Sequence, residues 1–517
     1  MTLRARDAPV YKNQILAVEP TGIEFVPEQQ RHGHARQLFS LWFSANAEIA
    51  TWMVGLFIVA LYGTSLRGAV FGIIIGNLLG FGLLGVLSTF GPRYGVPQMV
   101  ASRLAFGRYG NALPAALSFL AGVGWFAINT VFGAYALQTI TGHPYILSLA
   151  LMLSLQITLA VYGYNLIHVF ERVSAVLLAA GFILLGIITV HRAHWGAAFN
   201  PHAPFAGGGE LGGIILATAL GFSYATGWVP CASDYSRYLP TATKAGSIWW
   251  YAFLGCIIPC ISLEVLGAAT VTAVPHVDLS SASPTQAISV LLGSGVVSKV
   301  VLLTVALGTL TANCMNLYSG AMAALVVKFP TQSLRAPSVV AAIFAALTAL
   351  MLALAHAPAS AILGVAAAVG VVVGVVARLK IVRWRAAVMV GVLGAILASG
   401  GGHPEQTAQV YTNFLLLLSY WASPWAAVVF VDWLYRRNHQ LADPFSLSPR
   451  IKTGTLAWIL GLIGSVPFWN QAWFTGPFAA AYPQFGDLSY YVGFIIAAVA
   501  MAIAGHETRS VQQSTPP

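Results

Sequence analysis

The chain has 517 residues, of which 58% are hydrophobic and only 8% are charged. This composition excludes a soluble globular domain, and apolar runs of about 20 residues, each long enough to cross a bilayer as a helix, recur along the whole length. The net charge of +10 does not indicate nucleic-acid binding, because no part of the chain forms a separate basic domain and positive charge on a membrane protein usually reflects topology. We expect a polytopic membrane protein that contacts the lipid bilayer and no nucleic acid.

Hydropathy divides the chain into two polar tails and a long membrane domain. We expect a cytoplasmic N-terminal tail at 1–37, a transmembrane transporter domain at 38–504 and a cytoplasmic C-terminal tail at 505–517, with both tails loosely ordered. The N-terminal tail lacks the apolar core of a cleavable signal. Fourteen spans are predicted, at 38–61, 66–89, 112–138, 145–165, 172–190, 210–230, 246–273, 300–326, 337–355, 358–377, 384–400, 409–434, 453–470 and 487–504.

The distribution of Lys and Arg sets the orientation of these spans. On this scheme 22 of the 25 basic residues fall on one side of the membrane, and the other side holds Arg67, Arg192 and Lys299. Cytoplasmic loops carry the excess of positive charge. Both termini are therefore expected in the cytoplasm, in a protein of the plasma (inner) membrane with an even number of spans.

The same rule applies to the stretch between the basic clusters at 328–335 and 378–385. An even number of crossings must separate two cytoplasmic clusters, which favours the two extra spans between them. Cysteines introduced near His356 should then label from outside, and those near Arg383 from inside. The alternative is twelve spans, with this stretch re-entrant or interfacial.

The first span carries an acid, Glu48, where hydrocarbon is expected. A carboxylate at the centre of a bilayer costs about 2.5 to 3.5 kcal/mol on insertion scales, so Glu48 is a functional candidate by default. The residues before it, Ser44 to Ala47, are small or poor helix formers, so we expect the helix to unwind here and expose backbone carbonyls to an ion or a substrate. The alternative is a helix-packing seam in which a neutral Glu48 is hydrogen-bonded to a neighbour.

Two further spans carry a tryptophan beside polar or helix-breaking residues. In the third, Trp125 and Asn129 lie four residues apart on one helix face, which suits a planar ligand that stacks on the ring and bonds to the amide. Helix packing is the alternative reading of that pair. In the sixth, Gly227 and Pro230 flank Trp228, which predicts a second broken helix at a binding site, with a simple proline kink as the alternative.

The eighth span is unusually polar. The Thr311 hydroxyl is a plausible cation ligand together with carbonyls of a broken helix, because hard cations prefer oxygen. Asn313 and Asn316 are candidate substrate contacts or else join helices, with a functional role favoured for Asn316. Glu264, in the seventh span, is the other intramembrane acid, and a structural hydrogen bond and a proton relay are equally open for it.

Five stretches together resemble the nucleobase:cation symporter family, in its purine-cytosine permease branch. They are GIE at 22–24, LWFSAN at 41–46, GPRYGVPQ at 91–98, ASDYSRYLP at 232–240 and YTNFLLLLSYWASPW at 411–425. The resemblance covers nearly the whole chain except about 330–382. It implies an all-α membrane protein of the LeuT type, in which two inverted five-helix repeats place the site among the first, third, sixth and eighth spans. The protein then has twelve core spans and two extra spans near 337–377.

The resemblance also assigns a cation site by position. The family's cation-binding carbonyls fall on Ser44 and Ala47, and its hydroxyl ligand falls on Thr311. The sodium-coupled hydantoin member has a second hydroxyl ligand, and its position falls on Leu310. Leucine has no side-chain oxygen, so this position departs from the family's Na⁺ site.

The family's stacking aromatics fall on Trp125 and Trp228, and its polar contacts include Glu48, where the hydantoin member has a neutral Gln. The full predicted set of substrate contacts is Glu48, Trp125, Asn129, Gly227, Trp228 and Asn316. A carboxylate accepts hydrogen bonds from N–H groups, so Glu48 favours a ring with an exocyclic amine or a protonatable nitrogen, such as cytosine or a purine.

The residues and the resemblance together predict a secondary symporter that imports a nucleobase. A transporter for another planar heterocycle, such as allantoin, hydantoin or a vitamin, is the alternative. The sequence contains no metal-ligand cluster, nucleophile motif or phosphate loop, and its acids form no rings, so neither a membrane enzyme nor a channel is favoured. We expect no cofactor beyond a coupling ion.

The coupling ion is expected to be H⁺ or Na⁺. The three cation ligands apply only if the ion is Na⁺, whereas Glu48 and Glu264 are the candidates for a proton relay. A proton can ride on a carboxylate without a coordination cage, and Leu310 removes one expected sodium ligand. The sequence therefore favours H⁺ slightly.

Overall fold

The structure is a computed structural model that describes residues 22–162, 164–274, 284–331, 383–400, 404–437, 443–447, 450–471 and 473–514, together with residue 367. Secondary structure in these ranges is helical, apart from an isolated bridge between Asn470 and Thr475. Seven of the described helices are long and apolar enough to cross a membrane, or eight if a bent pair counts as one span, and three more are apolar but shorter. This is the all-α polytopic class predicted from the sequence.

The long helices follow the predicted spans. In chain order they are α1 (Arg36–Asn46), α2 (Ile49–Ala60), α3 (Leu66–Ser88), α7 (Ala112–Thr141), α8 (Tyr145–Tyr162), α9 (Tyr164–Arg192), α10 (Gly209–Trp228), α11 (Ala245–Ala273), α13 (Val296–Thr331), α16 (Arg383–Ser399), α17 (Pro404–Arg436), α18 (Thr453–Ser465) and α20 (Ser489–Ser514). Shorter helices connect them: α4 (Phe90–Tyr94), α5 (Gln98–Ala101), α6 (Arg103–Gly110), α12 (Pro284–Leu292) and α19 (Pro477–Ala481). The two extra spans expected at 337–355 and 358–377, and the labelling site near His356, lie outside the described residues.

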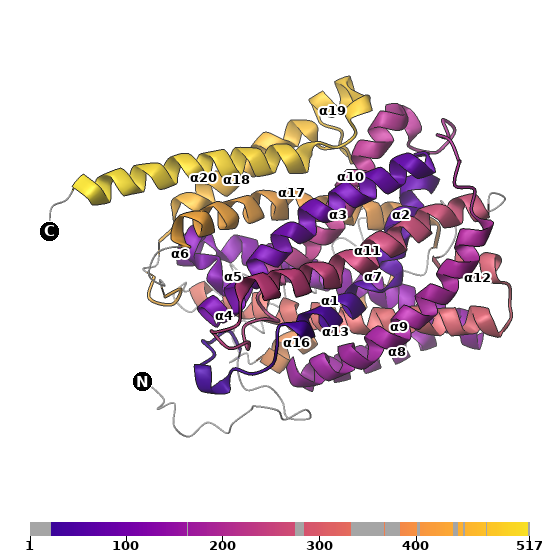
Figure 1. Ribbon diagram of the computed structural model, residues 1–517, viewed down its shortest axis with the longest axis horizontal. Coiled ribbons are helices and arrows are strands. Elements are labelled where there is room, and N and C mark those ends of the chain that lie inside the picture. The colour runs from indigo at the N-terminus through magenta and orange to yellow at the C-terminus, as the bar shows by residue number, and fades with distance from the viewer. Residues whose placement is uncertain are drawn as a thin grey trace.

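The helices pack as two interlocked groups. α10 packs along α3, and α11 packs along α1 and α2. Helices from the first part of the chain, α1 to α3, therefore contact the helices α10 and α11 from its middle. α7 and α13 pack against each other in the same way. α18 and α20 lie along one edge of the bundle beside α17 (Figure 1). The centre of the bundle is therefore bounded by α1, α2, α7, α10 and α13.

Glycines allow the closest of these helix contacts. A Cβ on Gly76 of α3 would lie 2.4 Å from the carbonyl oxygen of Thr218 on α10. A Cβ on Gly55 of α2 would lie 1.6 Å from the carbonyl oxygen of Glu264 on α11. Small residues at such positions let helix backbones approach in a membrane, where dispersion contacts supply much of the association energy.

Gly55→Ala should therefore destabilise the folded protein, because the new methyl group meets backbone that cannot move aside. Overpacking of a tight interior typically costs about 1 to 3 kcal/mol. The matched control is Gly82→Ala on α3, where an added Cβ has nothing within 4 Å. Thermal unfolding in detergent should show a lower midpoint for the Gly55 variant and an unchanged or higher one for the control. Equal midpoints would contradict the tight contact between α2 and α11.

The described parts of both tails, 22–37 and 505–514, are more ordered than the sequence predicted. The segment before α1 is held on the helices by buried arginines, because Arg31 Nη1 donates to the Pro92 carbonyl (2.5 Å) and Arg237 Nη1 donates to the Gly22 carbonyl (2.6 Å). α20 continues to Ser514, so most of the expected C-terminal tail is helical. The expectation of loose order is wrong for 22–37 and 505–514. Polarity alone does not reveal that buried guanidinium groups need backbone acceptors.

Candidate functional site

The first span is broken between α1 and α2, at Ala47 and Glu48, and the expected unwinding from Ser44 is wrong for Ser44 to Asn46, which stay helical. α1 ends at Asn46, α2 begins at Ile49, and the pair is bent by 54°. Ala47 (φ −79°, ψ 66°) and Glu48 (φ −138°, ψ 169°) have non-helical backbone angles. A break of this kind frees carbonyl groups at the end of one half-helix and amide groups at the start of the next, which then need partners inside the protein.

The predicted cation ligands gather at this break. Thr311 Oγ1, on α13, donates to the carbonyl oxygens of Ser44 (2.9 Å) and Gly308 (2.7 Å). The Ala47 carbonyl lies against Gly308, where a Cβ would come within 2.8 Å of its oxygen. The structure therefore brings Ser44, Ala47 and Thr311 together between α1 and α13.

A further intramembrane acid, Glu171 on α9, lies at the same place. It is fully buried, and its Oε2 accepts a hydrogen bond from Ser44 Oγ. Its Oε1 is buried without a hydrogen-bond partner among the described residues. Cys314 of α13 and Glu48 both lie close enough to interact with its charge. The sequence predicted Glu264 as the other intramembrane acid besides Glu48. This prediction is corrected, because Glu171 is a third.

The chemistry of these groups fits a hard monovalent cation. Backbone carbonyls, a hydroxyl and a carboxylate are all oxygen donors, the ligand type that hard cations prefer. A buried carboxylate oxygen without a hydrogen-bond donor needs a positive partner or a proton. Leu310, beside Thr311, contributes no side-chain oxygen.

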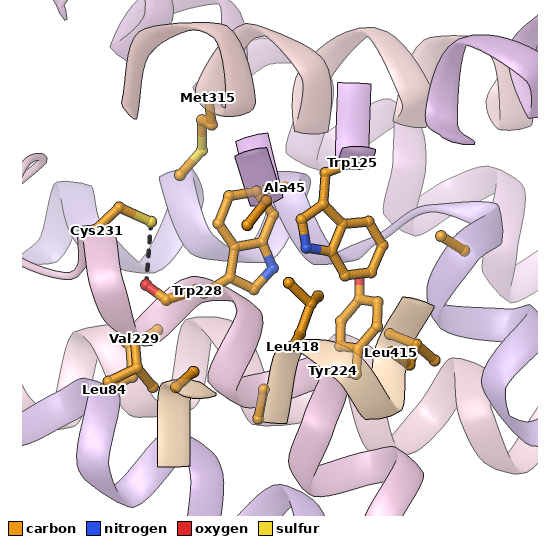
Figure 2. Packing of buried hydrophobic residues seen from close by; sticks show 14 of the residues in the cluster. Ala45, Leu84, Trp125, Tyr224, Trp228, Val229, Cys231, Met315, Leu415 and Leu418 are labelled. Carbon is orange, nitrogen blue, oxygen red and sulfur yellow. Dashed lines mark hydrogen bonds between the residues drawn. The ribbon is translucent and has the colours of Figure 1, made fainter. Parts of the chain in front are cut away.

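The two predicted stacking residues lie close together in the centre of the bundle (Figure 2). Trp125 on α7 is 5% exposed and Trp228 on α10 is 4% exposed. Trp125 packs edge to face with Tyr224 (5.5 Å between ring centroids) and Phe414 (5.3 Å), and Trp228 with Trp42 (5.6 Å). Edge-to-face contacts fix the ring planes. The two indoles are therefore held in defined orientations and away from bulk solvent.

Gly227 lies directly against the Trp125 ring. A Cβ on Gly227 would come within 3.0 Å of Trp125 Nε1. Any larger side chain at this position would push the indole away from its aromatic neighbours. The structure thus connects Gly227 with both predicted stacking residues.

The sixth span differs from its prediction in one respect. α10 ends at Trp228, as the glycine and proline beside it indicated, and a 3₁₀ turn follows at Val229–Cys231. No second helical half follows before α11 begins at Ala245, so this span is not discontinuous in the way that α1 and α2 are. The chain turns away instead, because side chains beyond the break are tied to neighbouring elements, as when Ser236 Oγ donates to the Ser88 carbonyl (2.6 Å).

Polar groups gather around Glu48. The Tyr224 hydroxyl on α10 donates to Glu48 Oε1 (3.1 Å) and shares a hydrogen bond with Thr51 Oγ1 (2.6 Å). Asn129 lies beside the same carboxyl group. Glu48 Oε2 and both polar atoms of the Asn129 amide have no hydrogen-bond partner among the described residues. Buried polar atoms without partners are costly, so these are groups that a bound ligand can satisfy.

The two asparagines of α13 differ in their surroundings. Asn313 Nδ2 donates to Thr130 Oγ1 on α7 (3.0 Å), which joins the two helices. Asn316 Nδ2 donates to Asn313 Oδ1 (3.2 Å), and its backbone carbonyl lies against Gly122, one turn from Trp125. Asn313 therefore joins α13 to α7, and Asn316 lies against α7 about one turn before Trp125.

Residues 25–382, more than half of the chain, match a known protein family. That family is described as permeases for cytosine/purines, uracil, thiamine and allantoin. The chain belongs to this family. Members of the cytosine/purine permease family are transporters, so the protein is a transporter and not an enzyme.

Relatives of this permease cover nearly its whole length. The putative purine-cytosine permease YxlA of Bacillus subtilis (strain 168) is 27% identical over 494 residues, which is 94% of this chain and 95% of that one. The purine-cytosine permease fcyB of Emericella nidulans is 26% identical over 501 residues, which is 93% of this chain and 87% of that one. The resemblance to the purine-cytosine permease branch is therefore confirmed.

Solved structures show the same fold. Mhp1, a nucleobase-cation-symport-1 family transporter in a closed conformation with bromovinylhydantoin bound, matches with a TM-score of 0.66 at 19% identity over 96% of each chain. A substrate-bound, outward-open Na⁺-coupled sialic acid symporter matches with a TM-score of 0.55 at 12% identity over 93% of this chain and 90% of that one. These likenesses confirm the predicted LeuT-type fold of this permease.

Glu264 of the permease has a structural partner. Asn77 Nδ2 on α3 donates to Glu264 Oε2 on α11 (2.7 Å). Glu264 Oε1 and Asn77 Oδ1 have no hydrogen-bond partner among the described residues. The structural hydrogen bond considered for Glu264 is thus present, and the proton relay stays a prediction.

Three residues near the site were not singled out in the sequence. Tyr224 and Thr51 lie inside apolar runs, and they are identified only by the hydrogen bond between them and by that of Tyr224 to Glu48. Glu171 directly precedes Arg172, where a span was predicted to begin. The sequence therefore indicated that both charged side chains lie outside the membrane. α9 in fact begins at Tyr164, which places Glu171 two turns inside the helix. The sequence signal that could have found it is the apolar stretch preceding this acid.

A cleft of about 410 Å³ lies between α10 and α17. It is lined by the end of α2, the start of α10 and the first half of α17, including Tyr62, Gly212, Thr412 and Asn413. Thr412 and Asn413 are flanked on α17 by Tyr411 and Phe414, both of which contact Trp125. The residues of α17 that line the cleft are thus next in sequence to those that contact Trp125.

Proposed function

We propose that this permease imports a nucleobase of the cytosine or purine type together with a cation, H⁺ or Na⁺, by alternating access. The observation that carries the proposal is the pair of buried indoles, Trp125 and Trp228, beside Glu48 Oε2 and an Asn129 amide that lack hydrogen-bond partners among the described residues. A planar base stacks on aromatic rings, while its edge offers donors and acceptors to fixed polar groups.

Each polar group suits one part of such a base. Glu48 Oε2 accepts from an N–H or an exocyclic amine, and its Oε1 is already positioned by the Tyr224 hydroxyl. The Asn129 amide both donates and accepts, so it can pair with a ring nitrogen and an adjacent amine or carbonyl. Asn316 is the third polar contact. A base with an exocyclic amine satisfies the carboxylate better than uracil or hydantoin does.

The coupling cation is assigned to the break between α1 and α2. Ser44 O, Ala47 O and Thr311 Oγ1 would hold Na⁺, and Glu48 or Glu264 would carry a proton if the ion is H⁺. Ala47 and Glu48 are adjacent, so an ion at the break lies next to the group that contacts the base. Such an arrangement links the two binding events through one helix interruption.

We further propose an orientation with both termini in the cytoplasm of the plasma membrane. The excess of Lys and Arg on one side supports it. The cleft at the start of α10 and α17 then opens on the outer side and is the entry route for the base.

Binding of a panel of bases to the purified protein tests this function. Cytosine, adenine, guanine, uracil, hydantoin and allantoin are compared by thermal shift, each with and without Na⁺ at two pH values. A base present at 100 times its Kd stabilises the folded protein by about 2.7 kcal/mol. We expect the largest shifts from cytosine or a purine.

The outcome of the panel also decides between the two candidate substrates. Shifts from allantoin or hydantoin that exceed those from cytosine and the purines would favour another planar heterocycle. Shifts from none of the six compounds would contradict the proposed base site. Competition uptake in cells with a labelled base provides the second measurement.

A further inference from the structure

Glu171 lies where α9 meets both the break after α1 and the middle of α13. Ser44 Oγ of α1 donates to its Oε2, and Cys314 of α13 is within reach of its charge. Thr311, one turn before Cys314, donates to the carbonyl of the same Ser44. The carboxylate therefore shares its immediate neighbours with the predicted cation ligands.

Helix packing alone does not explain a carboxylate at this position. The only hydrogen bond that Glu171 makes with the described residues comes from a neutral hydroxyl, and its Oε1 receives none. A glutamine would accept the same bond from Ser44 without bringing a charge into the membrane. A buried charge is expensive unless a positive group pairs with it, so an ionised Glu171 calls for a cation. A protonated Glu171 would instead need an acceptor for its hydrogen, and Oε1 has none among the described residues.

We propose that Glu171 is an anionic ligand of the coupling cation and that this cation is Na⁺. The inference rests on the proposed symport function and deepens it. With Ser44 O, Ala47 O and Thr311 Oγ1, the carboxylate completes a set of four oxygen ligands drawn from α1, α9 and α13. It supplies the oxygen that Leu310 lacks, and its charge balances that of the ion.

The position of Glu171 also accounts for coupling between the ion and the base. Ser44 is bonded to Glu171 through its side chain and to Thr311 through its carbonyl. Filling this site fixes Ser44, near the end of α1, against α9 and α13, three residues before Ala47 and four before Glu48. Na⁺ therefore orders the break on which the proposed base contact depends.

The test measures Na⁺ binding directly, without transport. Full-length protein in detergent is titrated with NaCl at constant ionic strength, with choline chloride as the balancing salt, and its thermal midpoint is recorded. Cytosine and adenine binding are then measured with and without Na⁺. Wild type is compared with Glu171→Gln and with Glu210→Gln, which changes a carboxylate that is bonded to Ser65 at the far end of α10 from Trp228.

We expect Na⁺ to stabilise wild type and the Glu210 variant, and to tighten binding of the base to both. Glu171→Gln should bind Na⁺ at least about tenfold more weakly, since loss of even an outer partner of a metal site costs about 10- to 100-fold in affinity. The same variant should still bind the base without Na⁺. That retained binding separates a specific loss of the ion from general damage to the fold.

Two results would overturn the inference and leave the proposed function standing. One is base binding by wild type with no response to Na⁺, and the other is an equal Na⁺ response in wild type and Glu171→Gln. A wild-type protein that binds none of the bases would instead contradict the proposed function. If Glu171→Gln does not fold, Glu171→Asp decides the question, because it keeps the charge one methylene group shorter and should show a weakened but measurable Na⁺ response, whereas an unchanged one would overturn the inference.

Discussion

Replacing Trp125 with alanine should abolish high-affinity uptake of the base while the protein still folds. The indole lies against Tyr224, Tyr411 and Phe414, so its plane is set before any ligand arrives. Stacking of a base on an aromatic side chain is worth about 1 to 3 kcal/mol, which is about 5- to 150-fold in affinity. Uptake of a labelled base at low concentration, and thermal-shift binding to purified protein, measure the loss.

Two variants make this result specific. Trp250→Ala removes an exposed tryptophan of α11 and should leave the apparent affinity for the base unchanged. Trp125→Phe keeps an aromatic face of smaller area and should retain part of the affinity. An unchanged affinity in Trp125→Ala, with normal expression, would remove this residue from the site.

Much of the central architecture could be predicted because it depends on local chemistry. The small and polar residues before Glu48 predict a weak point in the helix, and α1 ends directly after them, at Asn46. Gly227 and Pro230 likewise mark the end of α10 at Trp228. The spacing of Trp125 and Asn129 places them on one face of α7, and both lie in the centre of the bundle.

Other features could not be read from local sequence because they depend on partners far along the chain. Glu171 becomes part of the cation region only through Ser44, which lies 127 positions away. Tyr224 reaches Glu48 across 176 positions. The segment beyond Trp228 does not resume as a helix because of its contacts with distant loops. In each case the deciding hydrogen bond joins elements that hydropathy treats as independent.

The identity of the coupling ion is where sequence and structure lean in different directions. The sequence favours H⁺ slightly, because Leu310 replaces a hydroxyl and Glu48 is an acid at the break. The structure places the carboxylate of Glu171 on Ser44, beside the three oxygen ligands that the sequence predicted. As the proposed fourth ligand it supplies the oxygen donor that Leu310 lacks, so the Glu171 proposal leads to Na⁺.

We therefore expect proteoliposomes to concentrate the base under an imposed Na⁺ gradient at fixed pH, and not under a pH gradient without Na⁺. A tenfold Na⁺ gradient stores about 1.4 kcal/mol per ion, enough for about tenfold accumulation if one ion moves with each base. Glu171→Gln should equilibrate the base without concentrating it, and Glu210→Gln should behave as wild type. Accumulation that follows the pH gradient and ignores Na⁺ would return the coupling role to Glu48 or Glu264, since a carboxylate that carries a proton needs no oxygen cage around it.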